Sequence, residues 1–126
     1  MASILRVNTL TDASSNNSTA VSVINQGTAK AWVNFNGEGT IASRDTYNVS
    51  GLTDVGTGTY TIAFSNNMGN VNYAPSGMAE GDGKVVIGDS NYAGKVLASS
   101  IQINVKSGGT YYDREAVCTT IHGDLA

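Results

Sequence analysis

Short runs of alternating apolar and polar residues, separated by glycine-rich turns, are the feature of this chain that most constrains its fold. Successive side chains of a strand point to opposite faces, so residues 30–35 and 58–64 each place three apolar side chains on one face. These side chains are Ala31, Val33 and Phe35 in the first run and Tyr60, Ile62 and Phe64 in the second. Residues 47–52 have the composition of a strand between them. The glycines of segments 36–39 and 53–58 suit tight chain reversals, which predicts hairpins.

The rest of the C-terminal part continues in the same way. Four further strands are predicted over residues 71–78, 84–87, 99–106 and 116–123. Pro75, the only proline, has no N–H for a ladder, so we expect its strand at a sheet edge or a bulge. This spacing predicts an all-β chain, with an antiparallel β-sandwich of about eight to ten strands. We assign the β-sandwich domain to residues 29–126.

Residues 1–28 differ from the rest and are interpreted as an N-terminal arm. Residues 3–10 alternate only weakly and are compatible with a short strand. The polar run 12–19 is interpreted as a linker, because it has too few apolar side chains to offset the entropy of ordering it. Residues 21–24 are apolar enough that we expect them to dock on another surface.

Composition excludes several classes of protein. Only 13% of residues are charged, the formal net charge is -3 and the basic residues are scattered, so we expect no nucleic-acid partner. The chain begins without the basic and apolar regions of a signal peptide and has no apolar run of about 20 residues, so we expect a soluble cytosolic product without membrane insertion. Cys118 is the only cysteine, which excludes an intrachain disulfide and an intrachain thiolate metal cluster. We expect no metal and no cofactor.

The chain also lacks the motifs of common catalytic sites. It has no G-x-S-x-G elbow, no phosphate-binding glycine loop and no second histidine beside His122. A glycan-cleaving enzyme needs two placed carboxylates, and although pairs such as Glu38 with Asp45 or Glu80 with Asp82 exist, nothing in the sequence singles them out. We therefore expect no enzyme activity and no catalytic residues.

The stretch of residues 29–68, AKAWVNFNGEGTIASRDTYNVSGLTDVGTGTYTIAFSNNM, followed by NYAPSG at 72–77, resembles the C-terminal domain of tail-fibre and host-adhesion proteins of tailed bacteriophages. Residues 3–19 are similar to the short leader found before that domain, and residues 116–124 resemble its final strand. The resemblance implies a homotrimeric virion protein, made in the host cytoplasm, that attaches to a host surface glycan or protein by multivalent, non-catalytic binding.

The short arm leaves a second virion role open. Many members of that family carry a shaft or baseplate-binding module ahead of this domain, whereas here about 28 residues precede it. Residues 1–28 are therefore expected to contact other tail, baseplate or capsid proteins, unless another protein carries the chain. The alternative function is a structural virion protein, either a capsid decoration or cement protein or a component of tail or baseplate assembly, whose N-terminal arm exchanges into a neighbouring subunit.

Candidate binding residues come from the polar loops between residues 79 and 112. Tyrosine offers a broad, rigid ring with a polar tip, so Tyr92 with its neighbour Asn91, and the pair Tyr111 and Tyr112, are candidates for receptor contact. Ordinary packing at strand ends is the alternative for all of these rings. Trp32 lies on the face opposite the apolar one and is a candidate for a subunit interface, with a ligand platform as its alternative.

Two other clusters have simpler explanations. The loop 80–83 and nearby Asp89 carry the oxygen ligands that Ca²⁺ prefers, but without the spacing of a calcium loop, so a solvated turn is favoured. Cys118 and His122 share a face of the last strand without a partner residue that would make a metal or nucleophile site. Residues 113–115 are interpreted as a solvated turn with a surface ion pair.

Overall fold

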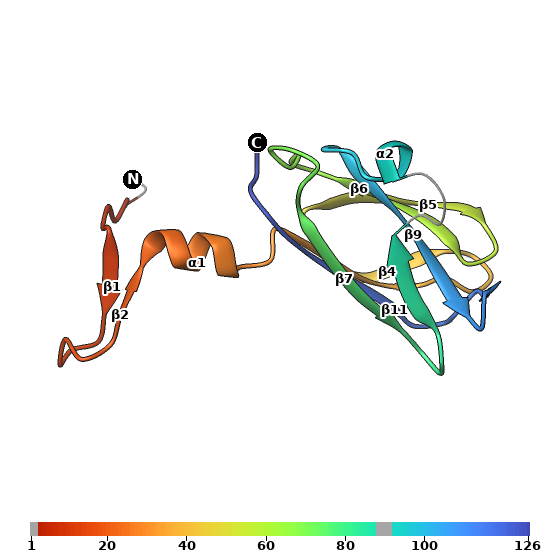
Figure 1. Ribbon diagram of the computed structural model, residues 1–126, viewed down its shortest axis with the longest axis horizontal. Coiled ribbons are helices and arrows are strands. Elements are labelled where there is room, and N and C mark those ends of the chain that lie inside the picture. Colours follow the sequence, from red (N-terminus) through yellow and green to blue (C-terminus); the bar gives the residue numbers. More distant parts are fainter. Residues whose placement is uncertain (1–2, 88–91) are drawn as a thin grey trace.

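The computed structural model describes residues 3–87 and 92–126, except for the side chain of Tyr92, and divides into a projecting arm and a β-structured body (Figure 1). The arm contains β1 (Thr9–Thr11), β2 (Ser18–Ala20) and α1 (Val21–Gly27). The body contains β3 (Ala31–Asn36), β4 (Ala42–Tyr47), β5 (Val49–Gly56), β6 (Thr59–Phe64), β7 (Ala74–Ala79), β8 (Lys84–Ile87), α2 (Tyr92–Lys95), β9 (Ser100–Ser107), β10 (Thr110–Tyr111) and β11 (Val117–His122).

The strands of the body form one continuous sheet that wraps around a single core. The strand order is β4-β3-β11-β7-β8-β9-β6-β5, β10 pairs with β9, and every pairing is antiparallel. The two end strands, β4 and β5, are consecutive in the chain, so the sheet curls back on itself into a nearly closed, flattened barrel. The predicted antiparallel, mostly β class is confirmed, and the described residues contribute nine strands to the barrel. A single wrapped sheet encloses the core that two facing sheets would enclose in a sandwich.

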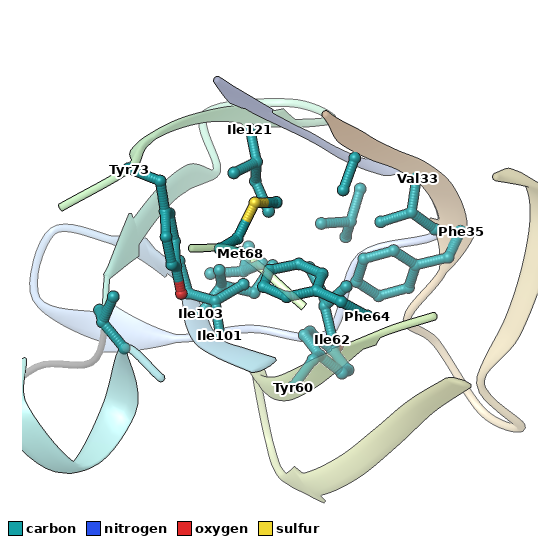
Figure 2. Packing of buried hydrophobic residues seen from close by; sticks show 14 residues of the cluster. Val33, Phe35, Tyr60, Ile62, Phe64, Met68, Tyr73, Ile101, Ile103 and Ile121 are labelled. Carbon is teal, nitrogen blue, oxygen red and sulfur yellow. The ribbon is translucent and has the colours of Figure 1, made fainter. Parts of the chain in front are cut away.

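The core consists of the side chains that the alternating pattern placed inward. Figure 2 shows Val33, Phe35, Tyr60, Ile62 and Phe64 packed with residues of β9 and β11. The remaining buried apolar residues are Ala31, Met68, Tyr73, Val96, Ile101, Ile103, Val105, Val117 and Ile121. The rings of Phe35 and Tyr60 meet edge to face with their centroids 5.1 Å apart, a geometry that aromatic quadrupoles favour. Sequence periodicity therefore predicted the inner face of the barrel correctly.

The prediction of one strand over residues 47–52 was wrong, because Asn48 interrupts it. Asn48 has a φ of 55°, a left-handed conformation that ends β4 and starts β5 in a new direction. Its side-chain Nδ2 donates to the backbone oxygens of Lys30 and Asn66, at 2.9 and 3.0 Å, and its Oδ1 accepts from the backbone N–H of Asn66 at 2.7 Å. These hydrogen bonds fix the corner at which the barrel begins to close.

Pro75 does not lie on an edge strand, because β7 is inside the sheet between β11 and β8. It stands level with Ile121 of β11. Among the described residues the pairing of β7 with β8 is limited to Met78 and Lys84, at the other end of β7. At Pro75, strand β7 is therefore paired with β11 but, in the described part of the chain, not with β8, which limits the effect of the missing N–H.

The arm is ordered into a hairpin and a short helix, which corrects the interpretation of residues 12–19 as a linker. Residues 12–19 include the hairpin turn, in which the Asp12 carboxylate accepts hydrogen bonds from the Asn16 backbone N–H and the Asn17 side chain at 2.9 and 2.8 Å. These hydrogen bonds hold the pKa of Asp12 below its usual value. Residues 21–24 begin α1, in which no residue is buried within the chain, so their docking on another surface stays a prediction.

Candidate functional site

The barrel has two ends with different chain connections. Strand β3 runs away from the arm, and its antiparallel partners β4 and β11 run back toward it. The connections between strands therefore lie alternately at the end near the arm, the arm end, and at the opposite end, here called the distal end. The distal end carries the segments 37–41, 57–58, 80–83, 108–109 and 112–116. Residues far apart in the sequence therefore meet at one surface, which is where barrels and sandwiches commonly present binding loops.

A buried tyrosine hydroxyl links three of these segments. The Tyr60 hydroxyl lies 2.7 Å from the Gly37 carbonyl oxygen and 2.9 Å from Oδ1 of Asp113, so its single proton is donated to one of the two at a time. The same Asp113 oxygen accepts from the Gly58 backbone N–H at 2.7 Å. Burial, followed by the hydrogen bond to the Asp113 carboxylate, raises the pKa of Tyr60 far above its usual value. The Tyr60 side chain therefore stays neutral, and its hydroxyl holds the Gly37 and Asp113 segments together beneath the distal surface.

Two tyrosine rings at the distal end are each covered by a basic side chain. The Lys106 ammonium lies 4.4 Å from the centroid of the Tyr111 ring, and the Arg114 guanidinium carbon lies 4.9 Å from the centroid of the Tyr112 ring. The first contact follows from β-pairing, because Tyr111 stands level with Lys106. Such cation–π contacts hold the long basic side chains over the rings. Tyr112 is 40% exposed and Tyr111 is half-buried, so the pairs are open to solvent.

The acidic loop 80–83 is bound to its neighbours by hydrogen bonds. Asp82 forms an ion pair with Arg114 at 3.0 Å and accepts a hydrogen bond from the Ser107 hydroxyl. The pKa of Asp82 is lowered by the Ser107 hydrogen bond first and by the charge of Arg114 as well. Glu80 accepts from the backbone N–H of Glu115 at 2.9 Å. Within residues 3–87 and 92–126, no group of three His, Cys, Asp or Glu side chains is arranged to hold a metal ion, and Asp89 lies outside the described residues.

Residues 113–115, interpreted from sequence as a solvated turn, connect the distal loops to the sheet. Arg44 of β4 reaches across to Glu115, with 2.7 Å to its backbone oxygen and 3.3 Å to its carboxylate. Arg114 joins Tyr112 and Asp82, and Asp113 joins Tyr60 and Gly58. The sequence contained one signal for this role, the run of aromatic and charged residues at 111–115, but the partner residues are too distant in sequence to be inferred.

No protein-family model, no curated protein and no solved structure matches this chain. Neither helix of the described residues is long and apolar enough to cross a membrane.

The structure describes two of the four binding residues predicted from sequence. Tyr111 and Tyr112 belong to the distal surface. Asn91 and the side chain of Tyr92 lie outside the described residues, so this predicted pair stays a prediction.

The outer face of the barrel carries Trp32 and a groove. Trp32 is half-buried and stands between its cross-strand neighbours Tyr47 and Thr120, an arrangement suited to either an interface or a platform for a ligand. A groove of about 540 Å³ runs along β7 and β11 past Met78 and Cys118, both exposed, to the start of the loop 80–83. The groove is continuous with the distal surface.

Together, the distal loops offer ring faces, cations and carboxylates on a surface braced from below by Tyr60. Such a set of groups binds polar partners through stacking, hydrogen bonds and charge. The four charged side chains Glu80, Asp82, Asp113 and Arg114 already make hydrogen bonds or ion pairs within the chain. Their positions are consequently held before any ligand arrives, which lowers the entropy lost on binding.

Proposed function

We propose that this chain is an adhesin of a tailed-phage virion, a tail-fibre protein that attaches to the host cell surface by non-catalytic binding. The observation that carries this proposal is polarity: the arm leaves one end of the barrel and the aromatic and charged loops occupy the other (Figure 1). A protein with one end on the virion and the other on a host surface needs this separation. The resemblance of residues 29–68 to phage tail-fibre domains supports the same assignment.

In this proposal the adhesin is a homotrimer that binds a glycan or protein of the host surface. A single surface of two tyrosine rings and their cations is small and open, so one copy binds weakly. Linking several copies raises the overall avidity by roughly 10²–10⁴ when the geometry lets them bind together. Trimerisation is thus the feature that makes weak distal surfaces effective.

Binding to whole cells tests this proposal. The labelled full chain is expected to bind cells of the bacterial host and, in excess, to slow the adsorption of virions. Tyr112→Ala and Arg114→Ala are expected to abolish both effects while the thermal unfolding midpoint changes little. Tyr47→Ala serves as the matched control, because Tyr47 is also an exposed tyrosine but lies on the outer face of β4. A chain that neither binds host cells nor competes with virions is not the adhesin.

The alternative, a structural virion protein, is favoured by one feature of the arm. Ile4, Leu5 and Val23 are exposed there, and exposed apolar side chains on a projecting segment are typical of assembly contacts. Deleting residues 1–20 is expected to prevent incorporation into virions while leaving the barrel folded. Antibody labelling then separates the two roles, since labelling of the head supports a capsid decoration and labelling of the tail supports the fibre.

A further inference from the structure

The barrel has an open seam between its two end strands. β4 pairs only with β3, and β5 pairs only with β6, within the described residues. Each of these strands therefore has one edge of backbone N–H and C=O groups without a sheet partner. Natural proteins usually blunt such edges or cover them, because a free edge recruits another strand. The seam is therefore a place where added chain gains backbone hydrogen bonds.

The seam also has an incompletely covered apolar floor. A cavity of about 370 Å³ lies between β4 and β5. Ile41, Val49 and Leu52 line it, and all three are half-buried side chains packed against the core. Covering them would remove further apolar surface from water, which favours association.

The arm supplies a segment with the matching properties. Residues 3–8, here called the lead segment, are exposed, and Ile4 and Leu5 are 75% and 78% accessible to solvent. The elements behind it are a hairpin with strands of three residues each and a helix of seven residues, both too short to be stable alone in water. An arm of this kind is expected to gain its stability from a partner surface.

The geometry points to exchange of the arm, in which the lead segment of one copy adds to the β4 edge in the seam of a second copy. α1 carries the lead segment away from its own barrel, so that it is presented to a neighbour (Figure 1). This is β-augmentation, in which main-chain hydrogen bonds give affinity and alternate side chains give specificity. The groove on β7 and β11 is the weaker receptor, because β11 is paired on both sides and offers no free backbone.

One register satisfies both charge and burial. In an antiparallel pairing that sets Arg6 opposite Asp45, Leu5 lies opposite Thr46. Asp45 is on the outer face of β4 and Thr46 on the inner face, as their β3 partners Asn34 and Val33 show. Arg6 then meets an acidic side chain in solvent, while Leu5 points into the seam. Within residues 3–87 and 92–126 neither Arg6 nor Asp45 forms an ion pair, so their opposite charges are able to pair with each other. Asp45 Oδ1 accepts a hydrogen bond from the Thr46 backbone N–H at 2.9 Å, and strand addition at this register exchanges that bond for one to the lead segment.

This proposal rests on the homotrimer in the proposed function and assigns the surfaces through which the copies contact one another. The contact joins two different surfaces of the chain, so it is heterologous and closes into a ring when the rotation allows. In a closed ring of three copies, each lead segment occupies the seam of the next copy, so no arm and no seam is left unpaired.

A charge swap tests the register. Arg6→Glu and Asp45→Arg, each alone, are expected to weaken self-association in sedimentation equilibrium by about two- to fivefold, the effect of one exposed ion pair. The double variant Arg6→Glu with Asp45→Arg is expected to recover the affinity. Unchanged near-ultraviolet circular dichroism controls for folding. Failure of the double variant to recover, in a chain that still associates, contradicts the register.

Disulfide trapping tests the exchange itself. In a Cys118→Ser background, Leu5→Cys with Thr46→Cys is expected to give covalently linked oligomers on oxidation. Leu5→Cys with Thr120→Cys is the control, because Thr120 lies on the outer face of β11. Association without these bonds overturns the exchange and leaves the homotrimer standing, whereas a full chain that stays monomeric overturns both. A bond formed within one chain shows that the arm folds back and overturns the exchange.

Discussion

The two ends of the barrel are held together by different kinds of interaction. At the distal end, side chains of separate loops meet in ion pairs, cation–π contacts and hydrogen bonds, and Arg114 contacts both Tyr112 and Asp82. At the arm end, the amide of Asn48 bonds to backbone groups, and Gln26 meets Asp124 at 3.0 Å. The distal end is therefore a surface of mutually bonded charged and aromatic side chains, whereas the arm end is held by the amide side chains of Asn48 and Gln26. In the part of the chain that the structure describes, the preorganised set of charged and aromatic side chains lies at the distal end.

The largest expected effect on stability comes from adding a side-chain carbon at Gly58, in the distal turn 57–58. Gly58 has a φ of +60°, and a Cβ there would lie 2.7 Å from the Val105 backbone oxygen. Gly58→Ala is expected to lower the free energy of unfolding by about 2–5 kcal/mol, through backbone strain and overpacking together. Gly108→Ala is the control, because Gly108 has a φ of +54° but open space around it, and its expected cost is about 1–2 kcal/mol. Urea unfolding measures both, and equal losses would show that steric contact contributes nothing at Gly58.

At the arm end, Asn48→Ala is expected to cost about 2–3 kcal/mol of unfolding free energy, because it loses the amide hydrogen bonds and puts alanine at a positive φ. Asn48→Gly keeps the conformation without strain and is expected to cost less. The comparison of the two in urea separates hydrogen bonding from backbone strain. If Asn48→Ala and Asn48→Gly lose the same unfolding free energy, the left-handed conformation at residue 48 does not contribute to the loss.

Acid sensitivity is expected to be a property of the distal end. The pKa of Asp82 is lower in the folded chain than in the unfolded chain, so its contribution to stability is present above the unfolded value of about 3.9 and is lost as the pH falls through the folded pKa. The difference in unfolding midpoint between the parent chain and Asp82→Asn is expected to be constant from pH 6 to 8. It is expected to shrink below about pH 4. Thermal scans at several pH values measure it, and a difference that grows on acidification contradicts the assignment.

The smallest effect is expected in the arm. Val23 of α1 is exposed, so Val23→Ala is expected to change the free energy of unfolding by less than about 0.5 kcal/mol. Val33→Ala, the same substitution in the buried part of β3, is the control and is expected to cost about 2–4 kcal/mol. Calorimetry of dilute protein measures both. A large loss at Val23 would show that α1 packs on a surface in solution.

The comparison also shows what sequence patterns can and cannot predict. Val33, Ile62 and Ile103 were placed inward correctly because a strand has a period of two and the core accepts only one face. The corner at Asn48 was missed because alternation carries no mark of a break, and one residue in a left-handed conformation suffices to make it. α1 was missed because seven residues give too short a pattern for a helical period.

The distal surface was predicted only in part. Tyr111 and Tyr112 were candidates because of their residue type, but their partners Lys106 and Arg114 were not. The ion pair of Arg114 with Asp82 joins two loops that meet only after the sheet has closed. Such contacts depend on strand order, which the local pattern of a sequence does not contain.

The pairing of the first and last strands of the barrel, β3 with β11, brings both ends of the body together at the arm end. A peptide linker between residues 126 and 29 is therefore short, and new termini opened at a distal turn give a circular permutant of the same barrel. Conversely, a fluorescent protein or a display scaffold fused before residue 29 or after residue 126 is held at the arm end. The loops of the distal end then remain unobstructed for binding assays.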